Sequence, residues 1–332
     1  MSIRTTAETH RSKVWLSSRT RARRAALRTG IAALLPVVLA LEPAAAAAAA
    51  AAADGPSAAA SAARGAESSV ERYEGRAYAR GSDRLLYRET HWLFEENGSA
   101  RRLVLYRCPE GAAFARKWVS GPMGLSGPES DSLRETAPDF DFVDGRDGYR
   151  EGVRTRAESR EVYVQEGARA PERVAALAVP AGAVIDAGFD ALVRSRWDEI
   201  FGSEPVTAPF LVPSRLGFLD VRFSPVADSP GAAESPAVVK ANDARVESRV
   251  RRLRLTLDHW YGFAAPAVEL EYSTRNRRLR SFSGIGSIRD GKGRNQDVRI
   301  IFAEADRVRN ASRQDITAAA NTVLAGQCGD RS

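Results

Sequence analysis

The sequence predicts an α+β fold built mainly from antiparallel β-strands: a curved sheet or incomplete barrel wrapped on one amphipathic helix, with a short helix near the C-terminus. Three observations lead to this prediction. Short segments of alternating apolar and polar residues follow one another from Tyr73 onward, separated by Gly, Pro, Asn and Asp. One segment in the middle of the chain has its apolar residues at helical spacing instead. A sheet of about a dozen strands is too large to stay open without curling.

Residues 1–53 are predicted to be an export leader that is removed. The first 30 residues are rich in Arg, and an uncharged apolar run follows at 31–41. That run is shorter than the roughly 20 residues that cross a bilayer. Ten alanines, Ala44 to Ala53, then offer small-residue cleavage sites. If 31–53 were instead an uncleaved anchor, Glu42 would lie inside the membrane at a cost of about 2.5–3.5 kcal/mol.

The basic charge of the chain belongs almost entirely to this leader. The whole sequence has 49 Lys plus Arg against 42 Asp plus Glu, a net charge of +7 and a pI near 9.7. Residues 1–53 hold eight of the basic residues and two of the acids, which leaves 41 against 40 and a net charge of +1. We therefore expect no nucleic-acid partner, a periplasmic location and a mature chain without a transmembrane domain.

The rest of the chain divides into a spacer, a domain and a tail. Residues 54–70 are Ala, Ser and Gly with little to bury, which is typical of a flexible spacer. A β-rich domain is expected over 71–310, interrupted at 224–247 by an exposed loop rich in Pro, Ala, Ser and charge. Residues 311–332 are expected to form the C-terminal helix and tail.

The clearest strand pair is a hairpin over residues 85–108. Trp92 and Phe94 precede a turn at 95–99, and apolar and polar residues alternate on the return strand. Further strands are expected at 113–119, 160–165, 174–179, 252–257, 268–272, 278–282 and 297–302. Residues 286–293 match the spacing of a phosphate-binding loop, but strands on both sides and a Gly in place of the Mg²⁺-binding Ser or Thr favour a hairpin turn.

Two segments have the spacing of helices. Between Asp186 and Phe201 the apolar residues form one stripe, which Asp186 would cap and Gly202 would end. Near the C-terminus the stripe repeats, with Ser312 as the predicted cap and Gly326 as the stop.

No motif in the sequence specifies a cofactor or a catalytic centre. His91 and His259 have no histidine partner at i+4, so they do not predict zinc, and surface or rim positions are expected for both. Arginines cluster at 249–254 and 275–280, where a solvated strand face is favoured over a phosphate-binding surface. We expect no cofactor.

The densest group of carboxylates is a weak candidate for Ca²⁺. It lacks the spacing of an EF-hand loop, and Asp-Gly pairs are turn formers, so a structural turn is favoured. Its members are Asp139, Asp141, Asp144 and Asp147.

The two cysteines, Cys108 and Cys328, exclude a disulfide-dense scaffold and any four-cysteine metal site. An oxidising compartment would let them pair, which would close a loop of roughly 220 residues. The sequence leaves open whether they do.

In the order and pattern of its predicted elements, the chain resembles exported bacterial half-β-barrel proteins of the periplasmic lipoprotein-carrier type, most of whose relatives are uncharacterised. The resemblance rests on the leader, the strand meander, the helix at 186–201 and the closing hairpins at 268–282 and 285–302. It implies an apolar cavity inside the curved sheet and a lipid, lipoprotein or other envelope amphiphile as partner. The expected lining residues are Trp92, Phe94, Phe114, Trp118, Phe189, Trp197, Phe218, Trp260 and Phe263.

Three functions remain open at this point. The leading hypothesis is a non-enzymatic periplasmic protein that binds an apolar or amphipathic component of the cell envelope. The first alternative is a structural or interaction protein of the envelope in which the same aromatic residues fill a packed core. The second is an envelope hydrolase that uses the acidic cluster at 139–147, although no nucleophile or metal set can be named for it.

Overall fold

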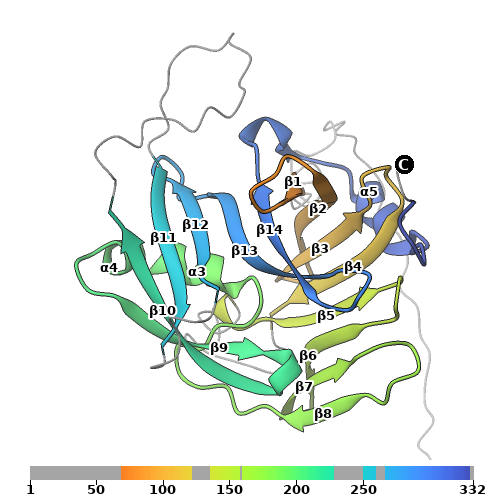
Figure 1. Cartoon of the computed structure of the whole chain (residues 1–332), viewed down its shortest axis with the longest axis horizontal. Helices are drawn as coiled ribbons and strands as arrows, with labels where there is room; N and C mark the ends of the chain where they lie inside the picture. Colours follow the sequence, from red (N-terminus) through yellow and green to blue (C-terminus); the bar gives the residue numbers. More distant parts are fainter. Residues whose placement is uncertain (1–68, 122–134, 158, 228–249, 259–265, 330–332) are drawn as a thin grey trace, which may run out of the picture. The chain divides into compact units, whose positions relative to one another are not determined.

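The computed structural model describes residues 69–121, 135–157, 159–227, 250–258 and 266–329, all within the compact unit Ala63–Ser332 (Figure 1). The predicted leader and most of the predicted spacer lie outside these residues. Val70, at the end of the predicted spacer, is buried, and its carbonyl accepts a hydrogen bond from the amide of Ala311. Among the described residues, no helix is both long enough and apolar enough to cross a membrane.

The described strands form one antiparallel sheet of 15 strands. Their bounds are β1 Glu71–Ala79, β2 Leu85–Glu96, β3 Ser99–Arg107, β4 Ala113–Ser120, β5 Asp139–Asp144, β6 Arg150–Arg156, β7 Ser159–Gln165, β8 Arg173–Ala176, β9 Val206–Val212, β10 Gly217–Val226, β11 Val250–Leu257, β12 Val268–Ser273, β13 Leu279–Arg289, β14 Asn295–Ile301 and β15 Val308–Arg309. From β8 the order runs back to β1, continues into β14 and runs back again to β9, while β15 pairs with β1 outside this path. The sheet ends at β8 and β9, so it is not closed, and the predicted fold class is confirmed.

The predicted hairpins are present, with tighter turns than expected. β2 and β3 are joined by Asn97 and Gly98 alone, with Glu96 opposite Ser99. The φ angles of these two turn residues are 52° and 71°, and a two-residue hairpin of type I′ requires both to be positive. The segment with phosphate-loop spacing is a hairpin turn between β13 and β14, in which Asp290 accepts hydrogen bonds from the amides of Lys292 and Arg294.

The central helix differs from its prediction. It is divided into α3, Gly188–Ser195, and α4, Trp197–Ile200, because Arg196 leaves the helical backbone conformation between them. Asp186 does not cap it, since its side chain pairs with Lys117 on β4 instead. The predicted apolar stripe does face the core, where Leu192, Val193, Trp197 and Ile200 are buried.

The C-terminal helix begins as predicted and ends early. α5 covers Arg313–Asn321, and the hydroxyl of Ser312 accepts a hydrogen bond from the amide of Gln314. The helix ends five residues before Gly326, the predicted stop. A second boundary also moves: β10 extends to Val226 and so includes 224–226, which the sequence assigns to the loop, while 228–249 lie outside the described residues.

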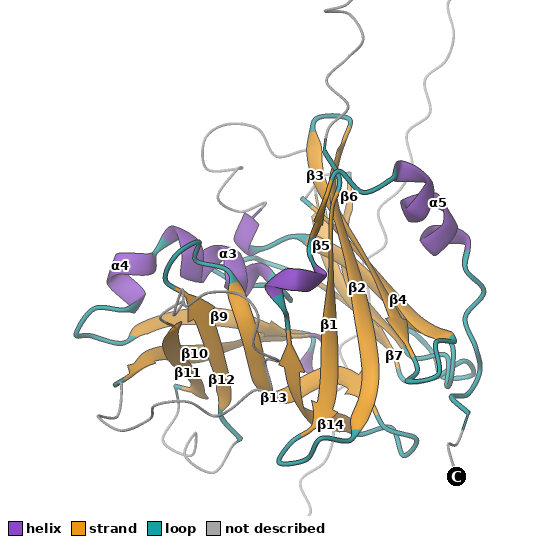
Figure 2. Cartoon of the chain, turned by 90° about the horizontal axis from the view of Figure 1, so that it is seen from above, coloured by secondary structure: helices purple, strands orange, loops and turns teal. Residues whose placement is uncertain are grey.

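The register of the sheet separates two faces, which we name by the helix packed on each (Figure 2). One row of opposed residues on the α3 face runs across β1 to β5: Tyr73, His91, Val104, Lys117 and Phe142. One row on the α5 face runs across β1 to β4: Arg72, Trp92, Leu103 and Trp118. Two large core clusters include residues of the α3 face, and a third lies between β2, β3 and α5.

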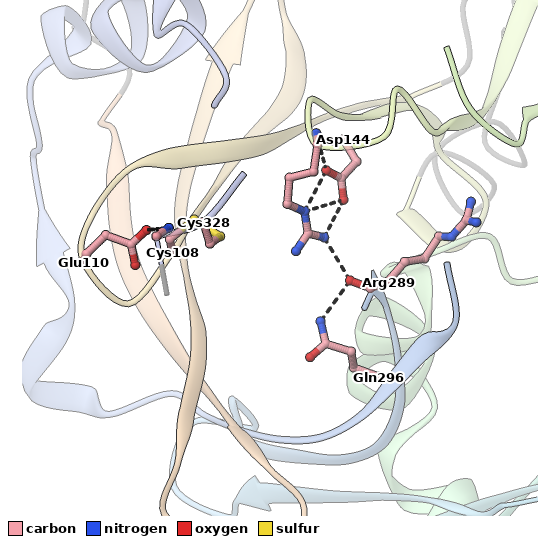
Figure 3. The surroundings of a disulfide bond; sticks show 8 residues. Cys108, Glu110, Asp144, Arg289, Gln296 and Cys328 are labelled. Carbon is pink, nitrogen blue, oxygen red and sulfur yellow. Dashed lines mark hydrogen bonds and ion pairs between the residues drawn. A yellow bond between two sulfur atoms is a disulfide. The ribbon is translucent and has the colours of Figure 1, made fainter. Parts of the chain in front are cut away.

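The C-terminal tail is attached to the β3–β4 turn (Figure 3). Cys108 and Cys328 form a disulfide with their Cα atoms 5.5 Å apart. The amide of Gly329 donates to Glu110 at 2.8 Å, and the amide of Ala325 donates to the carbonyl of Ala113 at 2.6 Å. The tail therefore holds the C-terminal end of α5 on the sheet, and the hydrogen bond from Ala311 to Val70 holds the chain just before the helix.

Replacement of both cysteines, Cys108→Ser with Cys328→Ser, is expected to lower the free energy of unfolding by about 5 kcal/mol, because the bridge restricts an unfolded loop of 220 residues. Urea denaturation of the wild type and of the double variant measures the difference. Mass spectrometry after alkylation without reductant is the control. Two alkylated thiols in the wild-type protein purified from its own compartment would contradict the bridge.

Candidate functional site

The aromatic residues predicted to line one cavity are distributed between the two faces of the sheet. Phe114, Phe189, Trp197 and Phe218 pack in the clusters of the α3 face. Trp92, Phe94 and Trp118 pack in the cluster below α5. Trp260 and Phe263 lie outside the described residues. The seven described members therefore do not form a single lining.

The α3 face holds a buried ion pair. The ammonium group of Lys117 lies 2.5 Å from a carboxylate oxygen of Asp186, and both side chains are almost fully buried. Burial alone would raise the pKa of Asp186, but the charge and hydrogen bond of Lys117 outweigh it, and the pKa lies below its usual value. Lys117 also lies over the rings of Phe140 and Phe142. This ion pair joins the start of α3 to the middle of the sheet.

His91 is buried on the same face, contrary to the surface or rim position that the sequence predicts. It is 8% exposed, and its ring stacks on Tyr73 with the centroids 4.5 Å apart. Its Nε2 lies 3.1 Å from a carboxylate oxygen of Glu89. Burial lowers the pKa of His91 and outweighs the opposing effect of Glu89. The sequence pattern missed this position because both faces of β2 are covered here: His91 and Trp92 point to opposite faces and both are buried. His259 lies outside the described residues.

The acidic residues at 139–147 are engaged one by one by neighbouring donors. Asp139 accepts hydrogen bonds from Arg160 and from the amide of Thr155, and Asp141 accepts one from the hydroxyl of Tyr163. Asp144 binds Arg146, which also donates to the carbonyl of Arg289 (Figure 3). Asp147 accepts from the amide of Tyr149. Asp139 and Asp141 also lie on the opposite face of β5 from Asp144, so the four carboxylates do not surround one point.

One group in the described part of the chain has the spacing of a metal site: Cys108, Glu110 and Cys328. Both sulfur atoms are bonded to each other in the disulfide. Cysteine binds a metal as the thiolate, so the two bonded sulfur atoms offer no metal ligands while the bridge is present.

A pocket of about 430 Å³ opens on the α5 face, where β1, β2 and β3 meet the chain between β14 and β15. The residues that line it are Arg72, Glu74, Arg76, Arg88, Thr90, Trp92, Arg107, Gly111, Ala305, Asp306 and Val308. Four of them are arginines and two are acids. The pocket therefore has two more positive than negative charges.

Three of these arginines stand in one row across the sheet. Arg76 on β1 is opposite Arg88 on β2, and Arg88 is opposite Arg107 on β3. Neighbouring strands are about 4.8 Å apart, and like charges directly opposite each other destabilise a sheet. A row of this kind lowers the stability of the fold unless something negative lies against it.

The acids of the pocket neutralise one member of the row. Arg76 binds both, with its Nε 3.2 Å from Glu74 and its Nη1 2.9 Å from Asp306. Arg107 donates to the neutral hydroxyl of Thr90 at 3.2 Å. Within the described residues, Arg88 has neither a hydrogen bond nor an ion pair to its side chain.

Arg107 is also partly buried. Burial lowers its pKa below the usual value, and the negative charge of Glu74 opposes this only in part. A guanidinium stays protonated in any case, so Arg107 is a half-buried cation whose positive charge Glu74 does not fully balance. The arrangement is therefore poor for stability and well suited to an anionic ligand.

An apolar wall adjoins the arginines. Trp92 lines the pocket and is 4% exposed, and its indole Nε1 is buried without a hydrogen-bond partner in the described structure. Val308, also in the lining, is one of the exposed large apolar residues. The pocket thus combines cationic groups with apolar surface.

The arginines that stand out in the sequence are not those of the pocket. In the cluster at 249–254, Arg252 and Arg254 pair with Glu271 and Glu269 on the neighbouring strand β12, as expected for a solvated strand face. The pocket arginines are spread over 36 positions of the sequence, from Arg72 to Arg107. Within its own strand, each of them looks like any other polar residue of an alternating pattern. Only the strand register brings them together.

Comparisons with known proteins leave the function open. No protein-family model and no curated protein matches the chain. A solved structure similar to it is the beta-barrel-like protein of domain of unknown function DUF1849 from Brucella abortus, at 10% identity and a TM-score of 0.37, covering 71% of this chain and 98% of that one. The similarity is to a β-barrel-like protein of unknown function and does not extend to the lipoprotein-carrier type.

Lys117→Met is expected to lower the free energy of unfolding by about 3–5 kcal/mol, because it leaves the buried carboxylate of Asp186 without its counter-charge. Asp186→Asn, which keeps the shape of the side chain, leaves the ammonium group in the same position. Urea denaturation of both single variants and the double variant gives the coupling energy. If the effects of the two single changes simply add in the double variant, the pair does not anchor α3.

His91 makes the stability depend on pH. Its pKa is lower in the folded protein than the unfolded value of about 6.5, so the unfolded state takes up the proton first as the pH falls. The stability from neutral His91 is complete above pH ~6.5 and is lost below it, by at most about 1.4 kcal/mol per pH unit. His91→Gln removes this slope, which urea denaturation between pH 7.5 and 5 measures. An equal slope in both proteins would contradict the assignment.

Proposed function

We propose that this chain is an exported periplasmic protein without catalytic activity that binds an anionic, amphipathic component of the cell envelope in the pocket of the α5 face. The observation that carries the proposal is the row Arg76, Arg88 and Arg107, in which three cations oppose one another across adjacent strands. The export leader predicted from residues 1–53 supports the location.

The charge and the surface of the pocket both support an amphiphile. Arg88 and Arg107 have no carboxylate partner in the described structure, and charge-assisted bonds from guanidinium groups are the strong way to hold an acidic head group. Val308, which is exposed, offers apolar surface to the adjoining part of such a ligand, while Trp92 is almost fully buried and contributes only its edge. A volume of about 430 Å³ lies within the usual range for small-molecule sites.

The interior of the curved sheet is the less favoured place for a ligand. The α3 face is occupied by two clusters of buried side chains and by the Lys117–Asp186 ion pair. This filling favours the second candidate, a structural or interaction protein of the envelope with a packed core. In that case the arginine row would contact an acidic surface of a partner protein instead of a small amphiphile.

A hydrolase that uses the acidic cluster has no support in the geometry. Asp139 and Asp144 are held by Arg160 and Arg146, and Asp141 and Asp144 lie on opposite faces of β5. General acid–base chemistry needs two groups that reach one reacting bond.

The Arg88→Ala and Arg107→Ala variants are expected to bind dodecanoate or dodecyl phosphate about tenfold or more weakly than the wild type, since each loses a charge-assisted hydrogen bond. Isothermal titration calorimetry with the purified mature protein, below the critical micelle concentration, measures the affinities. Arg254→Ala is the matched control, because that arginine is paired with Glu269 outside the pocket. Neutral dodecyl maltoside should bind weakly to all four proteins. Equal binding of the anionic and neutral amphiphiles would overturn the proposal.

A further inference from the structure

We infer that the pocket of the α5 face recognises a phosphomonoester group, a dianion, in preference to a singly charged carboxylate or sulfate ester. This inference rests on the proposed function and names the head group of its ligand.

The charge count favours a dianion. Arg72, Arg76, Arg88 and Arg107 face Glu74 and Asp306, which leaves two positive charges in excess. Both acids bind Arg76, so they are partly occupied and lie on the β1 side of the pocket. The net charge of +2 already includes the two negative charges of these acids, which would repel an anionic ligand. A phosphomonoester carries a charge of about −1.5 to −2 at pH 7, whereas carboxylates and sulfate esters carry a single charge and would leave one cation without compensation.

The positions of Arg88 and Arg107 favour a ligand group with several oxygen atoms. Arg88 and Arg107 are direct cross-strand neighbours, so their forked guanidinium groups start from backbones about 5 Å apart. The hydroxyl of Thr90, which already accepts from Arg107, lies in the same lining. A phosphate group has three oxygens and accepts from two guanidinium groups at once, which a single carboxylate does only by sharing its two oxygens.

The arginine row also affects the stability of the fold. Arg88 and Arg107 are opposite each other without a carboxylate partner in the described structure, which destabilises the sheet, and burial adds to this at Arg107. A dianion between Arg88 and Arg107 would remove both effects in the bound state. Binding is therefore expected to stabilise the fold as well as occupy the pocket.

The test compares ligands with equal chains and different head groups. Calorimetry with wild-type mature protein at pH 7.5 uses dodecyl phosphate, dodecyl sulfate and dodecanoate, all below their critical micelle concentrations. We expect dodecyl phosphate to bind at least about tenfold more tightly than the other two. Arg88→Ala and Arg107→Ala should abolish this preference, and Arg254→Ala, outside the pocket, should retain it.

A second series of titrations at different pH values tests whether the second negative charge of the phosphate group causes the preference. The second pKa of a phosphomonoester is about 6, so its preference should disappear at pH 5. The titratable groups around the pocket are those of Arg72, Glu74, Arg76, Arg88, Arg107 and Asp306. Dodecyl sulfate does not change its charge over this range, and its affinity therefore reports any change in the protein.

Inorganic phosphate distinguishes the source of the group. If it binds as tightly as dodecyl phosphate, the ligand is a free or soluble phosphate and the apolar wall contributes nothing, which supports the head group and contradicts the proposed amphiphile. If dodecyl phosphate, dodecyl sulfate and dodecanoate bind equally, the phosphomonoester inference is wrong while the proposed function stands. If none of them binds, both are wrong.

Discussion

The constraint on which the rest of the structure depends is the register of neighbouring strands from β1 to β5, which shifts only near the strand ends, at Ala77/Tyr78 and at Tyr106/Arg107. Side chains alternate between faces with a period of two, so a slip of one residue would exchange the two faces completely. This register places Lys117 on the α3 face, where it meets Asp186, and Arg88 on the α5 face, where it meets Arg76 and Arg107. One set of backbone hydrogen bonds therefore positions both the internal ion pair and the pocket.

The Lys117–Asp186 pair and the arginine row treat their charges in opposite ways. On the α3 face the charges of Lys117 and Asp186 are removed from water and matched one to one, which is the condition under which a buried charge is tolerated. On the α5 face Arg88 is exposed and Arg107 is half-buried, and both lack carboxylate partners in the described structure. Matched charges serve the fold, and unmatched charges in a pocket are available to a ligand. Helix α5, whose following tail is held by the disulfide at Cys108, covers the apolar part of the α5 face beside the pocket.

Much of the fold could be predicted because its signals are local. Alternation marks the hairpin of β2 and β3, and the Asn97-Gly98 pair marks its turn, since these residues tolerate the positive φ that the turn requires. The helix stripe and the Ser312 cap are local as well. The break at Arg196 and the early end of α5 were not predictable, because intrinsic preferences at helix ends are weak and contacts with the sheet decide them.

By itself, the sequence determined the charge balance of the chain, the β-rich class and most of the strands, because composition and periodicity act over a few neighbouring residues. Only the tertiary structure decided which side chains share a face. It buried His91, divided the predicted aromatic lining between two faces, and brought Arg76, Arg88 and Arg107 from three strands into one row. The physical reason is that a contact across a sheet depends on strand register, and register is a property of paired strands that no single strand contains.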